Sequence, residues 1–140
     1  MKNLFAVILM TISLSAIAHV GGHQEENIFT PKFGGKLAKV ENPSTSALIA
    51  ELAKDGKKGL FLYFYDKGMN LMSAKSSKAT VTGKITTGRG KRAKTMDVSF
   101  KISNNRFSTD LPEIKKRPYS IAIEVKQNGK VSKINFENLD

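Results

Sequence analysis

The chain contains no cysteine and almost no histidine. Without cysteine it can form no disulfide, no thiolate metal site and no cysteine nucleophile, and it cannot carry a lipid on an N-terminal cysteine. Its only histidines are His19 and His23, so the remaining chain offers no histidine base for a Ser-His-Asp arrangement. The acidic residues are scattered, and no pair is marked out as an acid and a base. We therefore predict that the protein is not an enzyme.

The chain also lacks an apolar run of the roughly 20 residues that a membrane-spanning helix needs. The longest apolar stretch, Leu4–Ile17, is shorter and includes three hydroxyl side chains. It follows the positive charge of Lys2 and leads into Ala16-Ile17-Ala18, which has the small-x-small pattern of a signal-peptidase site. This pattern predicts a signal peptide over residues 1–18 and a periplasmic or secreted bacterial protein without a transmembrane segment.

Acidic residues are few: the chain has 12 of them against 23 lysines and arginines, which gives a formal charge of +11. Cleavage after Ala18 leaves 122 of the 140 residues and, because Lys2 is lost, a charge of +10. Such a charge favours anionic partners such as lipid headgroups, lipopolysaccharide phosphates or nucleic acid. It also keeps soluble copies of a protein apart, which is the simpler interpretation. Aromatic residues do not alternate with the cations, so we do not expect nucleic acid as the partner.

Short β-prone segments make up most of the mature chain. Several alternate between apolar and polar residues, and turn residues such as Asp55-Gly56, Asn104-Asn105 and Asn128-Gly129 separate them. The expected strands cover Leu37–Val40, Ala47–Ala53, Leu60–Tyr65, Ala79–Ile85, Met96–Ile102, Arg106–Leu111, Ile121–Val125 and Ser132–Phe136. This pattern predicts an all-β domain, an immunoglobulin-like antiparallel β-sandwich of about seven strands. The cysteine pair and core tryptophan of antibody domains are absent.

Ala47–Ala53 leaves two interpretations open. Its alanine, leucine and glutamate favour a helix, which Ser46 could cap. A strand is also consistent, because an Asp-Gly turn connects the segment to the strongly β-prone Leu60–Tyr65. We favour the strand.

The mature chain divides into two parts. Residues 19–35 are polar and rich in glycine, which predicts a flexible leader, and residues 36–140 form the predicted β-sandwich domain. Ile28, Phe29 and Phe33 give the leader apolar side chains that can dock on the domain.

A metal site is one hypothesis for the leader. Cleavage after Ala18 would make His19 the N-terminal residue, so its free amine and imidazole could chelate one metal ion together with the His23 imidazole. Such nitrogen ligands favour copper(II) or another divalent transition metal. The alternative is that the two histidines have no specific role.

A basic hairpin is the second candidate site. Arg89, Lys91, Arg92 and Lys94 gather in a glycine-rich segment that we expect at a loop tip. Such a tip could bind phosphates or an anionic membrane surface, or it could be a solvated loop. Lys115-Lys116-Arg117 forms another basic cluster, for which the same alternatives hold.

The leader and the first strands resemble a known family. His19, Gly21-Gly22 and Gly34-Gly35, followed by Leu48–Gly56 and Leu60–Asp66, are similar to the N-terminal domains of periplasmic adaptor subunits of heavy-metal efflux pumps. The Thr80–Ile85 segment and the Asn128-Gly129 hairpin also fit. The resemblance implies a metal-linked periplasmic role without catalysis.

Two functions are therefore predicted. The first is an exported, noncatalytic binding module of the bacterial cell envelope, linked to metal-ion efflux or resistance through an envelope protein such as an efflux-system component. The alternative is a structural or interaction protein that docks anionic envelope components through the basic hairpin.

Overall fold

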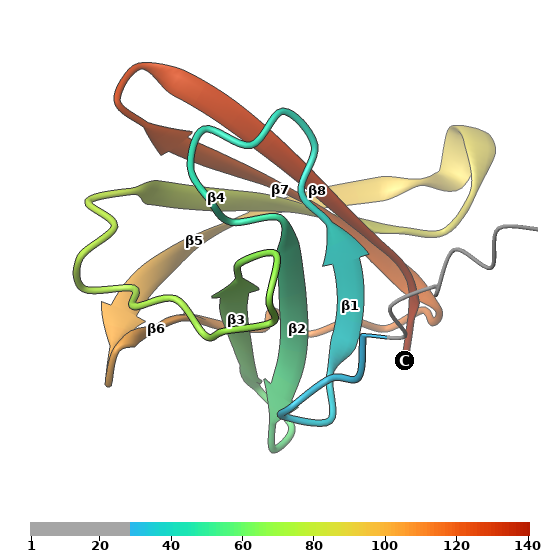
Figure 1. Cartoon of the computed structure of the whole chain (residues 1–140). Coiled ribbons are helices and arrows are strands. Elements are labelled where there is room, and N and C mark those ends of the chain that lie inside the picture. Colours follow the sequence, from blue (N-terminus) through green and yellow to red (C-terminus); the bar gives the residue numbers. More distant parts are fainter. Residues whose placement is uncertain (1–28) are drawn as a thin grey trace, which may run out of the picture.

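The computed structural model describes residues 29–140, and these form an all-β domain (Figure 1). Its eight strands are β1 (Lys36–Lys39), β2 (Ile49–Asp55), β3 (Gly59–Tyr65), β4 (Thr80–Thr87), β5 (Lys94–Ser103), β6 (Arg106–Asp110), β7 (Tyr119–Gln127) and β8 (Lys130–Leu139). All paired strands are antiparallel, which confirms the predicted class and pairing. Most of the ambiguous segment Ala47–Ala53, from Ile49 onward, lies in β2, and none of it is helical. The predicted signal peptide lies outside the described residues.

The predicted turns form where the sequence supplies residues that tolerate positive φ. Asn128 and Gly129 have φ of +51° and +73° in the β7–β8 hairpin, and Asn104 and Asn105 have +49° and +61° in the β5–β6 hairpin. Positive φ at both central residues matches the turn twist to the twist of the flanking strands.

The eight strands form one sheet in the order β1-β2-β3-β6-β5-β4-β7-β8. Strand β5 connects the two halves, because Lys94–Phe100 pair with β4 whereas Lys101–Ser103 pair with β6. At the opposite side the sheet nearly closes, since Glu41 and Lys133 exchange two backbone hydrogen bonds of 2.8 and 3.0 Å. The observed arrangement is therefore a nearly closed barrel of eight strands, where we expected two separate sheets of an immunoglobulin-like sandwich. Alternation in the sequence shows which side chains face inward, but it does not show which strands are neighbours.

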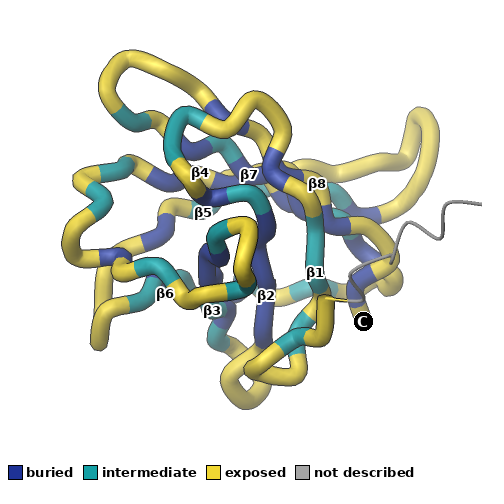
Figure 2. Tube along the Cα trace, in the orientation of Figure 1, coloured by how far each residue is buried: buried dark blue, intermediate teal, exposed yellow. Residues whose placement is uncertain are grey.

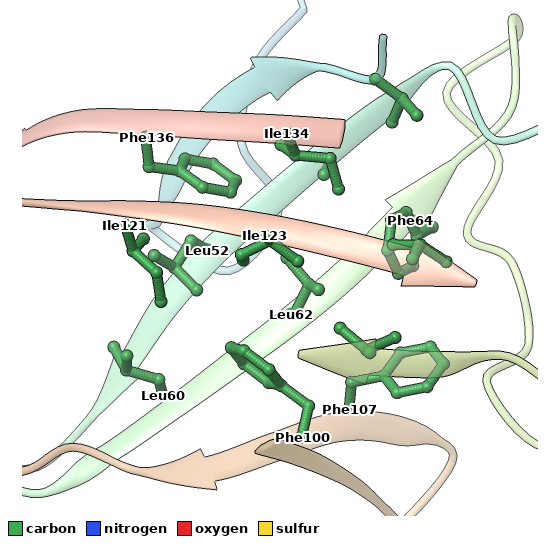
Figure 3. Packing of buried hydrophobic residues seen from close by; sticks show 14 of the residues in the cluster. Leu52, Leu60, Leu62, Phe64, Phe100, Phe107, Ile121, Ile123, Ile134 and Phe136 are labelled. Atoms are coloured by element: carbon green, nitrogen blue, oxygen red, sulfur yellow. The ribbon is translucent and has the colours of Figure 1, made fainter. Parts of the chain in front are cut away.

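The barrel interior is the hydrophobic core. Inward side chains from β2, β3, β5, β6, β7 and β8 point toward one another in Figure 3, among them Leu62, Phe107, Ile123 and Phe136. Each of these four is at most 2% exposed. In Figure 2 most buried positions lie on the strands, and most loop positions are exposed or intermediate. Gly83 also faces inward, and a Cβ there would lie 3.0 Å from Val98.

A smaller cluster lies on the outer face of β2 and β3. It consists of Ile49, Ala53, Tyr63 and Tyr65. Residues 32–35, which we call the N-terminal strap, cover part of this face. The Phe33 ring stacks on Tyr63 with ring centres 3.9 Å apart.

A buried carboxylate fastens the strap. Glu51 is 0% exposed, and its Oε1 accepts hydrogen bonds from the backbone N–H groups of Phe33 (2.9 Å) and Gly35 (2.8 Å). Its Oε2 accepts from the Lys32 N–H (3.0 Å) and the Tyr65 hydroxyl (2.6 Å). These four donors satisfy a charge whose burial would otherwise be costly. Burial raises the pKa of Tyr65, and its hydrogen bond to Glu51 raises that pKa further.

Candidate anion-binding cleft

Antiparallel pairing of β4 with β7 brings two distant segments of the chain together. Thr86, near the end of β4, lies directly opposite Ser120, near the start of β7. The hairpin that follows β4 and the connection that precedes β7 therefore lie at the same end of the barrel, on the right of Figure 1. These two segments carry the two basic clusters of the sequence.

The two segments line one cleft of about 720 Å³, which we call the basic cleft. Its cations are Arg89 from the β4–β5 hairpin and Lys115, Lys116 and Arg117 from the β6–β7 connection. Thr86 and Ser120 contribute to the lining, as do Gly88, Pro118, Tyr119, Glu137 and Asn138. The cleft thus has four cationic side chains, one carboxylate and two aliphatic hydroxyl residues.

The hairpin geometry separates the four predicted anion-binding residues. Gly88 has φ of +79°, and a Cβ on it would lie 3.0 Å from the Arg92 carbonyl oxygen, so the turn requires glycine here. A short 3-10 turn then covers Gly90–Arg92, and β5 begins at Lys94. Arg89, Lys91, Arg92 and Lys94 are all exposed, but only Arg89 lines the basic cleft.

Sequence reasoning noted Lys115-Lys116-Arg117 but did not place it in the candidate site. The run of three cations was the available signal. Nothing in the sequence pairs this run with Arg89, because the two are 26 positions apart and β4 could have paired with another strand. The observed pairing of β4 with β7 is what brings the two basic segments together.

Tyr119 forms the boundary between the cleft and the core. The residue is 2% exposed, and its hydroxyl is buried without a hydrogen-bond partner within residues 29–140. Burial raises its pKa, while the nearby Arg117 lowers that pKa and Asp140 raises it. The guanidinium of Arg117 lies 5.7 Å from the centre of the Tyr119 ring, within the range of a cation–π contact. The ring thus gives Arg117 a contact at the wall of the cleft.

The predicted metal ligands His19 and His23 lie outside the described residues. Within residues 29–140, no group of three or more histidine, cysteine, aspartate or glutamate side chains is arranged to hold a metal ion. The same part of the chain has no helix that is both long enough and apolar enough to cross a membrane.

Comparisons with family models, with curated proteins and with solved structures give no match to this chain.

Proposed function

We propose that this protein is an exported, noncatalytic binding module that docks phosphate-bearing anionic components of the bacterial cell envelope in the basic cleft. The observation that carries the proposal is the convergence of Arg89 with Lys115, Lys116 and Arg117 around one hollow. A solvated loop explains a single basic hairpin. It does not explain why two basic segments from different parts of the chain face the same cleft.

Electrostatics favours an anion in this cleft. Four cations and one carboxylate line the same cleft, so the positive charges add to one potential there and repel one another. A bound phosphate relieves this repulsion. The cleft also suits phosphate chemically, since arginine binds phosphate oxygens with two parallel N–H donors and hydroxyl side chains can donate further hydrogen bonds.

A binding role fits the residues better than catalysis does. The cleft contains a single carboxylate, Glu137, and both histidines of the chain lie before residue 29. Among residues 29–140, no second carboxylate and no histidine lines the cleft to complete a general acid and base pair with it. Export to the envelope follows from the predicted signal peptide. A link to metal efflux rests on His19 and His23 and needs its own test.

Two charge-removal variants test the proposal. The cleft variant combines Arg89→Gln, Lys116→Gln and Arg117→Gln, and the control combines Lys91→Gln, Arg92→Gln and Lys94→Gln. Both lose three charges, and the control residues are exposed neighbours in the same hairpin that do not line the cleft. Binding is measured by sedimentation with phosphatidylglycerol vesicles and with lipopolysaccharide, using phosphatidylcholine vesicles as the neutral reference.

Each cation near an anionic surface contributes about 1 kcal/mol, so the cleft variant should bind roughly 100-fold more weakly than the unmodified protein. The control should lose less than about tenfold. Stronger binding to lipopolysaccharide than to phosphatidylglycerol would identify the phosphate source. Equal losses in the two variants would show a nonspecific attraction that depends only on net charge, and the proposal would be wrong.

A further inference from the structure

A second hollow lies at the opposite end of the barrel from the basic cleft. Strand β3 pairs with β6 only as far as Leu62, opposite Phe107, although β3 continues to Tyr65. The sheet therefore opens between the end of β3 and the β5–β6 hairpin. Residues 66–79, which we call the roof segment, cross this opening before β4 begins (Figure 1, yellow-green loop).

Hydrogen bonds tie the roof segment to two strands and a hairpin turn around the opening. The Met72 N–H donates to the Phe64 carbonyl of β3 (2.8 Å). At the β5–β6 turn, the hydroxyl of Ser73 donates to the Asn105 side chain (2.6 Å). Near the end of β7, the Gln127 side chain donates to the Ser77 carbonyl.

A cavity of about 280 Å³ lies beneath this segment, and we call it the roofed cavity. Its inner wall consists of Leu62, Phe64, Phe107 and Val125, each at most 8% exposed. Met72 and Ala74 of the roof segment also line it. Figure 3 shows Phe64 and Phe107 close together at this end of the core.

The lining has no charge directed into the cavity. Arg106 is its one charged residue, and Arg106 donates to the Tyr63 hydroxyl (3.1 Å) and lies 3.4 Å from the centre of the Phe61 ring. Phe61 and Tyr63 alternate along β3 with the inward-facing Leu62, so the guanidinium lies on the outer face of the sheet. The polar side chains of Ser73, Asn105 and Gln127 already have the partners described above.

We infer that the roofed cavity binds an uncharged, apolar small molecule of about ten carbon atoms. The size follows from the volume, which is nearly twice the ~150 Å³ of an apolar cavity that holds benzene. We infer that the ligand is uncharged because the lining offers no partner to a carboxylate or ammonium group, and burying such a group without a partner is strongly disfavoured. Concave apolar pockets with a few polar groups at the rim are typical of small-molecule sites.

The first experiment compares ligands on the purified protein. Decanol at ten times its Kd should raise the melting temperature by about 5 °C, because a ligand that binds only the folded state stabilises it by mass action. Decanoate has the same chain with a charged head, and it should bind at least tenfold more weakly. If no alcohol from hexanol to dodecanol raises the melting temperature or shifts the amide resonances of Leu62 and Phe107, the inference is wrong.

Variants of the roof segment locate the binding site. Met72→Ala enlarges the cavity, so the best-bound alcohol should become longer, from decanol toward dodecanol. Leu71→Ala is the matched control, because Leu71 is adjacent, 47% exposed and outside the lining. This control should leave the preferred chain length unchanged.

A third variant, Ala74→Leu, fills the cavity and should weaken decanol binding at least tenfold. If Ala74→Leu does not fold, the chain-length comparison of Met72→Ala with Leu71→Ala still decides. The same preferred length in these two variants would place the ligand elsewhere and overturn the inference.

Discussion

Replacing Glu51 by glutamine should release the N-terminal strap. The carboxylate accepts hydrogen bonds from the N–H groups of Lys32, Phe33 and Gly35 and from the Tyr65 hydroxyl, two on each oxygen. Glutamine keeps one oxygen and puts an NH₂ donor in place of the other. The amide fits best with its NH₂ in the position of Oε2, where the Tyr65 hydroxyl can rotate and accept from it, so the Lys32 N–H is the donor that loses its acceptor.

The expected loss is a fraction of the total stability. A buried donor without a partner costs about 1–3 kcal/mol, against a typical domain stability of about 5–15 kcal/mol. The strap can avoid this cost by detaching, since its amides then bind water. We therefore expect local opening, in which the amides of Phe33 and Gly35 exchange hydrogen at least about fivefold faster while those of the barrel keep most of their protection.

Hydrogen exchange followed by NMR or mass spectrometry measures this directly. Asp55→Asn is the control, because Asp55 is an exposed carboxylate on the same strand. Gly35→Ala should reproduce the effect by another route, since its Cβ would lie 2.5 Å from the Leu52 carbonyl oxygen. Unchanged protection of Phe33 and Gly35 in Glu51→Gln would refute the reasoning, as would an equal loss in Asp55→Asn.

Three further predictions concern the tyrosines and the leader. Tyr119→Phe should raise the free energy of unfolding by about 1 kcal/mol, because it removes a buried hydroxyl without a partner, whereas Tyr65→Phe should lower it by about 2 kcal/mol, because Glu51 loses a donor. Burial raises the pKa of both tyrosines, so at high pH the folded protein keeps protons that the unfolded chain releases. The free energy of unfolding should therefore be at its full value below about pH 10 and decrease above it. Denaturant titrations should show a shallower decrease in Tyr119→Phe. Copper(II) titration of a chain that starts at His19 should give one nitrogen-ligated site whose affinity decreases as the pH falls. One extra residue ahead of His19 should remove the chelate, and equal affinity with that residue would contradict the metal hypothesis.

Strand alternation and turn type were predictable from the sequence because each depends on only a few neighbouring residues. Inward alternation at Val81 and Ile85 is observed in β4, and the Asn128-Gly129 turn forms as expected. The two basic segments were also visible as charge runs. These properties require only the side-chain period of a strand, the φ tolerance of asparagine and glycine, and counts of charge.

Neighbour relations required the tertiary structure. Glu51 alternates with the inward-facing Leu52 and so looks like a solvent-facing carboxylate, yet it is buried because the strap covers the outer face of β2. The Gly34-Gly35 pair allows the backbone of the strap to approach another segment closely, but it does not show that this segment contains Leu52.

The tertiary structure also decided which residues form the two candidate sites. Arg89 and Lys115–Arg117 share a cleft only because β4 pairs with β7. The roofed cavity exists only because β3 leaves β6 after Leu62. A strand's own residues specify its buried face, but the choice among possible partner strands depends on the packing of the entire core, which no short segment of sequence contains.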